Sequence, residues 1–336
     1  MDPHAFTTPF QLTKTMRREI YPATDPKSPK LSATDKTVLI TGATGGIGGA
    51  STSIKAHLTL LTVKQEVARA WALAGAKGIA LVGRNKALLD EPASAVKALS
   101  SSTQVVAFTA DLTSDSEVEA LFKQVTETLG LIDVLVHAAG STTTGTVGDL
   151  EPDVWFKDYE LNVKASYILV HQYLKTTTSG TVVFLGTLGA SFTFPGMSAY
   201  SGSKLALMKL AEFLDAEKPD LRVFTVHPGI VAVTETNRGA VVDALTPFAK
   251  DKGIQTGGLS LYLAQERADY LRGSFISVNC KSRCSRPETQ MLMMIQGMSK
   301  RWRLIKGKSR SRSCSSLLFS VRNSGQTVIH GRPENT

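Results

Sequence analysis

The chain has 336 residues, of which 42% are hydrophobic, and it carries a formal net charge of +9. Residues 281–336 hold 12 of the 38 Lys and Arg but only two of the 29 acids, so the preceding chain is almost neutral and lacks the basic signature of a nucleic-acid-binding domain. No run of about eighteen apolar residues predicts a transmembrane helix. All three cysteines lie at or beyond residue 280, which excludes a disulfide framework in the preceding chain.

The first 35 residues are predicted to form an extension, punctuated by prolines, that either packs over the edge of the fold or stays mobile. This N-terminus is polar and does not resemble a secretory signal, so we expect a cytoplasmic protein. Lys36–Ile40 is an apolar, β-branched run that predicts a buried strand. A glycine-rich turn, Thr41–Gly48, follows it, and such turns let the backbone approach a pyrophosphate at the start of the next helix.

The segment after this turn departs from the expected pattern. A helix should begin directly after Gly48, but a good helical pattern begins only at Glu66 and ends at Gly75. Removing residues 50–65 would bring Gly48 and Arg84 to about the spacing at which dinucleotide folds read the ribose. We therefore predict an insertion of sixteen residues, either a retained intron or a true family-specific insertion.

Beyond the insertion, strand and helix patterns alternate. Further strands are predicted at residues 78–82, 104–109, 132–136, 181–185, 221–226 and 274–278, and helices at 116–129, 155–174, 198–216 and 257–265. Alternation of this kind predicts an α/β fold, a single doubly wound parallel sheet (Rossmann fold), with its ligand at the carboxyl ends of the strands.

One pair of side chains within the predicted helix 198–216 suggests chemistry. Tyr200 and Lys204 are four residues apart, so a helix places them on one face. A tyrosine alone is a poor proton donor at neutral pH, because its pKa is about 10. A nearby ammonium should lower that pKa toward the working range. Alone, the spacing also fits a core tyrosine beside an exposed lysine.

The glycine-rich turn and the Tyr-x-x-x-Lys pair, in this order, resemble the short-chain dehydrogenase/reductase (SDR) family over roughly Lys36 to Asn279. The resemblance implies hydride transfer between a nicotinamide cofactor and a carbonyl or secondary alcohol. It implies that Tyr200 is the general acid/base, that Lys204 holds the nicotinamide ribose, and that Asn162 supports a proton relay through its backbone carbonyl. Thr187 occupies the position of the family's catalytic serine, and His137 replaces an asparagine that steadies the sheet.

The resemblance also implies a cofactor site and no metal site. Its residues would come from the glycine-rich turn and from the ends of the later strands: Gly42, Thr44, Gly46, Ile47, Gly48, Arg84, Asp111, Leu112, Ala138, Gly140, Tyr200, Lys204, Pro228, Gly229, Val231 and Thr234. Arg84 stands near where NAD-preferring relatives usually carry an acid. Its guanidinium suits a 2′-phosphate, so we expect NADP rather than NAD.

The sequence indicates less about the substrate and the oligomeric state. Phe192, Phe194, Met197 and Trp155 suggest an apolar pocket for a lipophilic ketone or alcohol, although aromatic residues at such positions are usually core. The family resemblance implies a homodimer or homotetramer, assembled through the helices around Trp155 and Ser198.

The sequence divides the chain into an extension (1–35), a nucleotide-binding domain (36–279) and a tail (280–336). The tail contains the basic run Lys308–Ser316 and no sustained apolar period, which predicts disorder. An RNA-binding arginine-serine tail and out-of-frame coding are alternatives. With the insertion, the tail leaves open an impaired or non-catalytic SDR-like protein.

Overall fold

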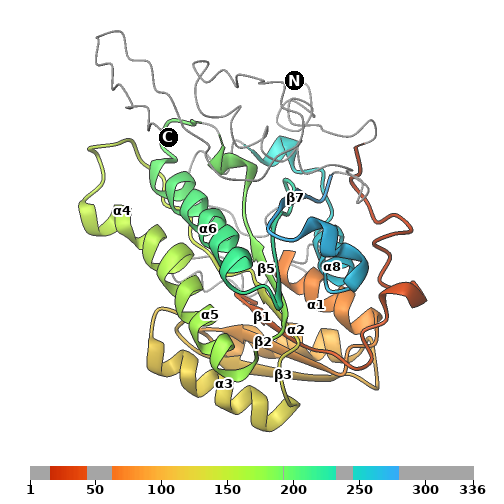
Figure 1. The fold of residues 1–336 in the computed structure, drawn as a ribbon. Helices are drawn as coiled ribbons and strands as arrows, with labels where there is room; N and C mark the ends of the chain where they lie inside the picture. Colours follow the sequence, from red (N-terminus) through yellow and green to blue (C-terminus); the bar gives the residue numbers. More distant parts are fainter. Residues whose placement is uncertain (1–15, 44–62, 192, 232–244, 280–336) are drawn as a thin grey trace, which may run out of the picture. The chain divides into compact units, whose positions relative to one another are not determined.

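The computed structural model describes residues 16–43, 63–191, 193–231 and 245–279. Within them, seven parallel strands form one sheet in the order β3-β2-β1-β4-β5-β6-β7 (Figure 1). The chain moves outward from β1 to β3 and then crosses back to β4, so the direction of winding reverses between β1 and β4. This doubly wound arrangement confirms the predicted fold class, and in such folds ligands bind at the carboxyl ends of the strands where the winding reverses.

The strands match their sequence predictions within two residues at each end. They are β1 (Thr37–Thr41), β2 (Gly78–Gly83), β3 (Gln104–Thr109), β4 (Val134–His137), β5 (Gly180–Leu185), β6 (Leu221–His227) and β7 (Phe275–Ser277). The described α-helices are α1 (Val63–Leu73), α2 (Ala87–Lys97), α3 (Asp115–Leu129), α4 (Pro152–Tyr159), α5 (Ala165–Thr176), α6 (Ser198–Glu217) and α8 (Ile254–Leu263). Short helical turns are η2 (Pro29–Leu31), η4 (Leu188–Ala190), η5 (Thr246–Phe248) and η6 (Glu266–Leu271).

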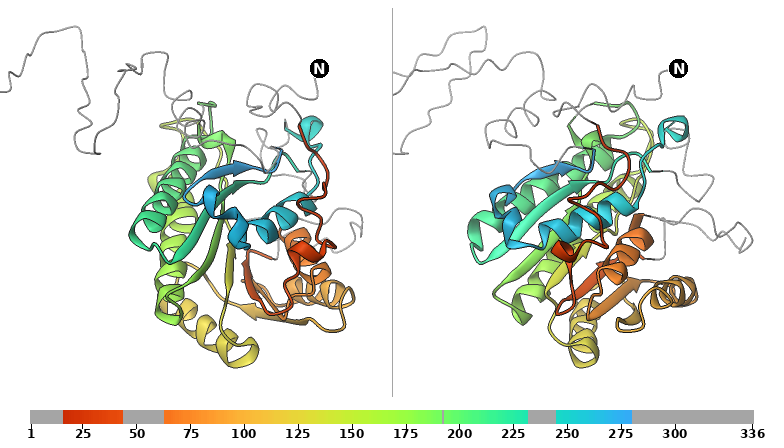
Figure 2. Two further views of the ribbon diagram at one scale, coloured as in Figure 1. Left: turned by 45° about the vertical axis from the view of Figure 1, so that its right-hand side comes forward. Right: turned by 90° about the vertical axis from the view of Figure 1, so that its right-hand side faces the viewer.

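Helices cover both faces of the sheet because successive strand side chains point to opposite sides. Val38 and Ile40 pack into the core cluster that contains α1 and α8, whereas Leu39 packs into the cluster that contains α3, α5 and α6. Figure 2 shows the same two layers from the side. The two faces explain why β1 is apolar throughout, since both of its sides are buried.

The described part of the N-terminal extension, residues 16–35, packs against α1 and α8 and, through Arg17, meets Asn279 just after edge strand β7. Leu31 is fully buried in the same cluster as α1, and the Ala33 amide donates to the Ala74 carbonyl at 2.9 Å. A Cβ atom at Gly258 in α8 would overlap the carbonyl of Thr24, so a glycine is needed where the extension crosses α8.

The predicted long helix over 155–174 is interrupted. Between α4 and α5 the residues Glu160–Lys164 form one π-helical turn, labelled η3, which contains Asn162. Such turns place one extra residue in the helix and often occur at functional sites, because they redirect side chains. The apolar spacing alone did not distinguish this turn from regular helix.

Two further elements differ from prediction. Helix α1 begins at Val63, so residues 63–65 of the predicted insertion belong to the helix. Helix α2 was not predicted; Pro92 lies inside it and obscures its pattern, although Leu89, Pro92 and Val96 form its buried face. Among the described residues, no helix is both long and apolar enough to cross a bilayer. The predicted tail, 280–336, lies outside the described residues.

Candidate active site

The candidate site lies where strands β1, β4, β5 and β6 end, next to the first turns of α6. Tyr200 is the third residue of α6, and Thr187 follows β5 by two residues. Burial raises the pKa of the Tyr200 phenol, the nearby Thr187 side chain acts to lower it, and the charge of Asp158 raises it. Thr187 Oγ1 also accepts from the Gly189 amide at 3.0 Å, which fixes its rotamer. The Thr187 hydroxyl therefore lies close enough to the Tyr200 phenol to influence its pKa.

Lys204 lies one turn further along α6 and is buried. Its Nζ donates to the carbonyl oxygen of Leu185, the last residue of β5, at 2.9 Å. A Cβ atom at Gly140 would lie 3.0 Å from Lys204 Nζ and 2.8 Å from Asn162 Oδ1, so the absence of a side chain there makes room for both. Burial lowers the pKa of Lys204 to about 8, with repulsion from Lys64 contributing.

The expected effect of Lys204 on the Tyr200 pKa is wrong for this structure. The pKa of Tyr200 is raised, with burial as the main cause, and Lys204 is not among the causes of the shift. The physical reason is desolvation: a phenol removed from water resists ionisation unless a cation faces it closely. Here the ammonium donates to the end of β5 instead.

Asn162 holds the loop after β4 against α6. Its Oδ1 accepts from the Ser141 amide at 2.9 Å, while its Nδ2 donates to the Ser141 carbonyl at 3.1 Å and to Ser203 Oγ at 2.9 Å. Ser203 Oγ in turn donates to the Tyr200 carbonyl at 2.9 Å. The Asn162 carbonyl, which the family resemblance assigns to a proton relay, accepts from Ser166 Oγ at 2.7 Å. The amide side chain thus connects the π turn, the β4 loop and α6.

His137, at the end of β4, is a buried neutral side chain. Thr41 Oγ1 accepts from the amides of Ala138 and Ala139, so its hydroxyl hydrogen is directed to His137 Nδ1 at 2.8 Å. This assigns the proton on the ring to Nε2. Burial lowers the pKa of His137 to about 3, with the charges of Lys204 and Lys64 contributing. The ring therefore joins β1 to β4, as expected for a structural residue.

Two glycines at the carboxyl edge, Gly42 and Gly229, pack closely against neighbouring protein atoms. Gly42 has φ +76°, and a Cβ atom there would lie 2.7 Å from the Ala139 Cα. Gly229, after β6, has φ +79°. Both conformations favour glycine strongly. The predicted cofactor residues Ala138 and Leu112 are buried.

Arg84 and Asp111 come from neighbouring strands and lie close enough to interact. Arg84 is exposed directly after β2, and Asp111 follows β3. Hydrogen bonds from the Thr113 amide and hydroxyl lower the pKa of Asp111, burial opposes this, and the charge of Arg84 contributes to the lowering. Asp111 Oδ1 therefore accepts two hydrogen bonds within a local turn, from the Thr113 amide at 2.9 Å and from the Thr113 hydroxyl at 2.7 Å.

Five of the predicted cofactor residues, namely Thr44, Gly46, Ile47, Gly48 and Thr234, lie outside the described residues, as does Phe192. The remaining predicted residues fall along the carboxyl edge. Pro228, Gly229 and Val231 form the turn that follows β6 and are partly exposed.

Sequence reasoning missed Asp158 and Lys64. Asp158 is fully buried, accepts from the Thr143 amide at 2.8 Å and hydroxyl at 3.0 Å, and its charge reaches both Tyr200 and Lys204. Its position four residues before Asn162 was the available signal, because that spacing puts both on one helical face. The sequence did not indicate that Lys64 lies near the site, because it belongs to the segment predicted to be inserted.

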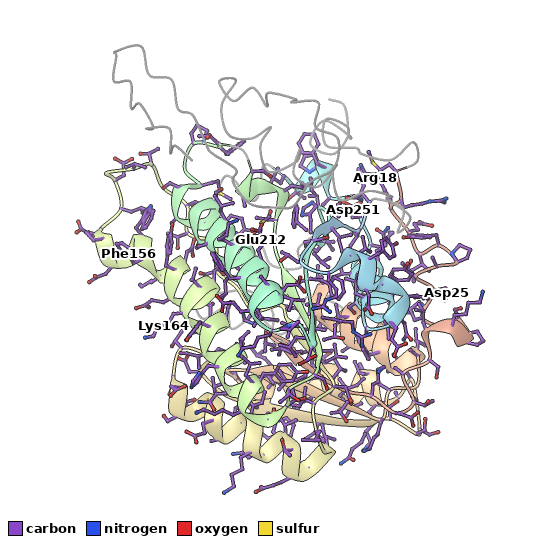
Figure 3. The ribbon with its side chains drawn as sticks, viewed as in Figure 1. Arg18, Asp25, Phe156, Lys164, Glu212 and Asp251 are labelled. Carbon is purple, nitrogen blue, oxygen red and sulfur yellow. The ribbon has the colours of Figure 1, made fainter. Side chains whose placement is uncertain are left out.

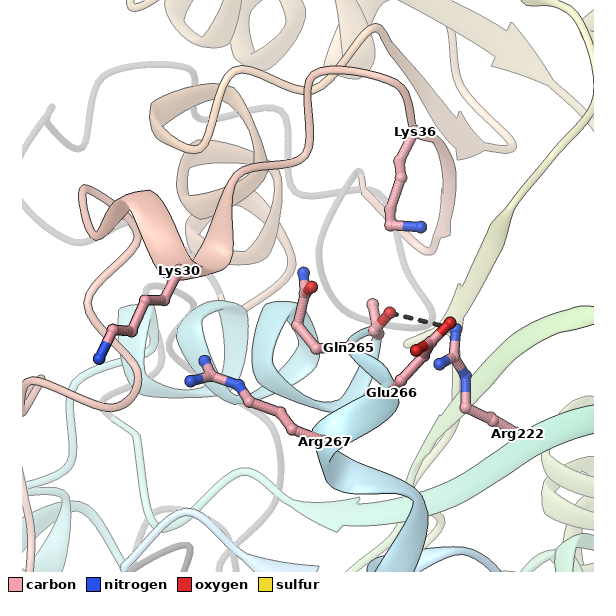
Figure 4. A pocket seen from close by; sticks show the side chains of 7 residues that line it. Lys30, Lys36, Arg222, Gln265, Glu266 and Arg267 are labelled. Atoms are coloured by element: carbon pink, nitrogen blue, oxygen red, sulfur yellow. Dashed lines mark hydrogen bonds between the residues drawn. The ribbon is translucent and has the colours of Figure 1, made fainter.

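A separate cavity of about 520 Å³ is lined by Lys30, Lys36, Arg222, Ala264, Gln265, Glu266 and Arg267 (Figure 4). Arg222 is the second residue of β6, so this cavity lies toward the amino ends of the strands. Arg222 Nη2 donates to the Ala264 carbonyl at 3.2 Å, and Arg267 stacks over the Tyr262 ring. None of the lining residues belongs to the candidate active site.

The fold and the site define a doubly wound nucleotide-binding α/β protein. The family model described as short chain dehydrogenase matches residues 62–243. The chain is 30% identical to the "Short chain dehydrogenase andI" of Emericella variicolor over 72% of this chain and 80% of that protein. It is 28% identical to the "Short chain dehydrogenase mpl6" of Monascus purpureus, covering 73% and 80%.

A solved structure of a short chain dehydrogenase from Shigella flexneri, complexed with NADP, superposes with a TM-score of 0.62 at 22% identity. The superposition covers 75% of this chain and 99% of that one. The chain therefore belongs to the short-chain dehydrogenase family, whose members are oxidoreductases that act on small molecules with NAD(P).

Proposed function

We propose that this protein transfers a hydride between NADP(H) and a carbonyl or secondary alcohol, with Tyr200 as the general acid/base. The observation that carries the proposal is the meeting of Tyr200, Thr187, Lys204 and Asn162 at the carboxyl ends of β4 and β5, where Asn162 Nδ2 donates to Ser203 Oγ and Lys204 Nζ donates to the Leu185 carbonyl. The nicotinamide would supply the hydride, and the residues of the chain would position the substrate and move the proton.

In the reductive direction, the Tyr200 phenol donates its proton to the substrate oxygen. The pKa of Tyr200 is raised by burial, so the phenol is protonated at neutral pH but is a weaker acid than a tyrosine in water. Thr187 orients the same oxygen through its hydroxyl. Lys204 has three N–H donors, one of which goes to Leu185, and we propose that others hold the nicotinamide ribose.

NADP preference rests on Arg84, which is exposed at the end of β2 and could pair with a 2′-phosphate through two parallel donors. An acid at Gly83 should shift the preference toward NAD, as measured by the ratio of NADPH to NADH dissociation constants. An unchanged ratio in Gly83→Asp would contradict the NADP assignment.

The test of the catalytic proposal is Tyr200→Phe, measured with NADPH and a panel of lipophilic ketones. Turnover should fall by about 100-fold or more, the usual contribution of a general acid. NADPH binding, followed by fluorescence, should stay within about twofold because the phenol hydroxyl is directed to the substrate oxygen. Turnover that survives in Tyr200→Phe would remove Tyr200 from the mechanism.

A second candidate is an SDR-like protein with impaired catalysis. The family match begins only at residue 62, α1 begins at Val63, and the charge of Lys64 in its first turn opposes that of Lys204. NADPH titration of the purified protein separates the two candidates, because a damaged phosphate-binding turn should not bind micromolar cofactor. Mass mapping of the cellular polypeptide would show whether residues 50–65 are present.

We also propose a homodimer or homotetramer built on α4, α5 and α6. Phe156, Tyr167 and Phe213 are between 55% and 59% exposed on these helices (Figure 3 labels Phe156). Exposed aromatic side chains gathered on neighbouring helices often mark an interface. Light scattering of the wild type and of Phe156→Glu tests this, and an unchanged assembly in the variant would exclude that face.

A further inference from the structure

A buried carboxylate lies beside the turn that follows β6. The Asp251 side chain is fully buried, and its Oδ1 accepts from Arg18 Nη1 at 2.9 Å and from Asn279 Nδ2 at 2.7 Å. Its Oδ2 accepts from the Ile230 amide at 2.7 Å. Figure 3 labels Arg18 and Asp251. One carboxylate therefore joins the N-terminal extension, the end of β7 and the turn after β6.

The turn after β6 is fixed by Asp251 through both backbone and side chain. The Asp251 amide donates to the Ile230 carbonyl at 3.1 Å, and Val231 pairs with Asp251 as a parallel bridge. A Cβ atom at Gly229 would lie 2.5 Å from Asp251 Oδ2. The carboxylate packs directly on the glycine, so its position determines where Pro228–Val231 lies.

Arg18 is held in place by its own backbone. The Arg17 amide donates to the Asn279 carbonyl at 2.9 Å, and Asn279 Nδ2 donates to the Arg17 carbonyl at 2.9 Å. The Lys252 amide donates to the Arg18 carbonyl at 3.3 Å. These bonds do not involve the Arg18 side chain, so truncating that side chain need not detach the extension.

We propose that the Arg18–Asp251 ion pair is a positioning device for the cofactor site, supplied by the N-terminal extension. The proposal rests on the proposed function and on the family resemblance, which assigns Pro228, Gly229 and Val231 to the cofactor site. A buried carboxylate that loses its cation must rearrange, admit water or take up a proton. Each response weakens the acceptor for the Ile230 amide and lets the turn move.

The experiment compares full-length Arg18→Ala, Arg18→Lys and a matched control, Arg272→Ala. The control removes a partly buried ion pair with Asp215 (3.2 Å) that lies outside the β6 turn. Amide hydrogen exchange of the peptide containing Ile230 reports on the turn without requiring activity. NADPH dissociation constants, measured by fluorescence, report on the cofactor site.

Arg18→Ala should speed exchange at Ile230 and raise the NADPH dissociation constant at least about tenfold relative to Arg272→Ala, since small displacements of site residues have large effects. Arg18→Lys, which keeps the charge, should recover most of both effects. Equal exchange and affinity in Arg18→Ala and Arg272→Ala would overturn the proposal. Faster exchange with unchanged affinity would also overturn it, because the pair would then only stabilise the fold.

Two outcomes separate this proposal from the proposed function. If wild-type protein binds no NADPH, the proposed function and the cofactor role of the pair fail together, while the exchange data still judge the control of the turn. If Arg18→Ala does not fold, Asp251→Asn takes its place, since it removes the charge and keeps the side-chain shape. Exchange at Ile230 and NADPH affinity of Asp251→Asn are then compared with those of Arg272→Ala, and equal values in the two variants would overturn the proposal.

Discussion

Two buried ionisable side chains at the carboxyl edge of the sheet have very different surroundings. Asp251 is matched by one cation and two further donors at 2.7 to 2.9 Å. Lys204 donates to the Leu185 backbone carbonyl; burial lowers its pKa to about 8, repulsion from Lys64 adds to this, and the charge of Asp158 offsets it only in part. A fully matched charge stabilises the arrangement around it, whereas an under-matched one is available to a ligand.

The largest stability effect should come from breaking the matched charge. Asp251→Leu leaves Arg18, Asn279 and the Ile230 amide without their shared acceptor, and it should lower the free energy of unfolding by about 3–5 kcal/mol. Urea denaturation measures this. The double variant Arg18→Met/Asp251→Leu should recover part of the loss, and no recovery would mean that the cation is unimportant to the deficit.

Removing the under-matched charge should have the opposite sign. The folded pKa of Lys204, about 8, lies below its ordinary 10.5, so the buried ammonium opposes folding below pH 8, and this penalty disappears as the pH rises toward 10.5. Lys204→Met should therefore stabilise the protein by up to about 3 kcal/mol at pH 7 while lowering turnover. A destabilised variant would show that Lys204 is better matched than its contacts suggest.

A backbone change tests whether the close packing of the β1 end on Ala139 tolerates a side chain. Gly42→Ala combines positive φ with a 2.7 Å approach to the Ala139 Cα, so it should cost about 1–3 kcal/mol. Cofactor affinity should fall with it. Gly148→Ala serves as control, because it has φ +98° but nothing within 4 Å of the added atom, and the difference isolates the steric part.

Two buried histidines, His137 and His227, should make the stability of the protein depend on pH. The folded pKa values of His137 and His227 are about 3 and about 4, below the ordinary 6.5. Each neutral ring contributes its full stability above pH 6.5. As the pH falls from 6.5 toward the folded pKa values, the free energy of unfolding drops by up to about 1.4 kcal/mol per pH unit for each histidine. His137→Asn should reduce the slope of stability against pH between 6 and 4 by about that amount, in unfolding measured across the range. The same slope in both proteins would contradict the neutral, buried ring.

The smallest stability effect should come from an exposed charge. Arg84→Ala should change the free energy of unfolding by no more than about 0.5 kcal/mol, as is usual at the surface. Its NADPH affinity should nevertheless fall about tenfold, because a charge-assisted bond to the 2′-phosphate is lost. NADH affinity is the internal control, and an equal loss for both cofactors would place Arg84 away from the 2′-position.

The fold was predictable because its signals are local and periodic. Buried strands such as 78–82 and 221–226 stand out as apolar runs, and the alternation with helices leaves few topologies. The π turn at Asn162 was not predictable, because one extra residue in a helix does not disturb the apolar spacing enough to be seen. The catalytic candidates were recognised by spacing and resemblance, but the raised pKa of Tyr200 depends on burial.

The sequence by itself determined the parallel sheet, the order of its strands along the chain, and the placement of Tyr200 and Lys204 on one helix. Only the tertiary structure brought Arg18 to Asp251, 233 residues away, and Asp158 close to the phenol. The reason is that the period of apolar residues shows which face of a helix or strand is buried. The partner of a buried charge, in contrast, depends on which distant segments of the chain meet in the fold. Such meetings between distant segments produce no local pattern in the sequence.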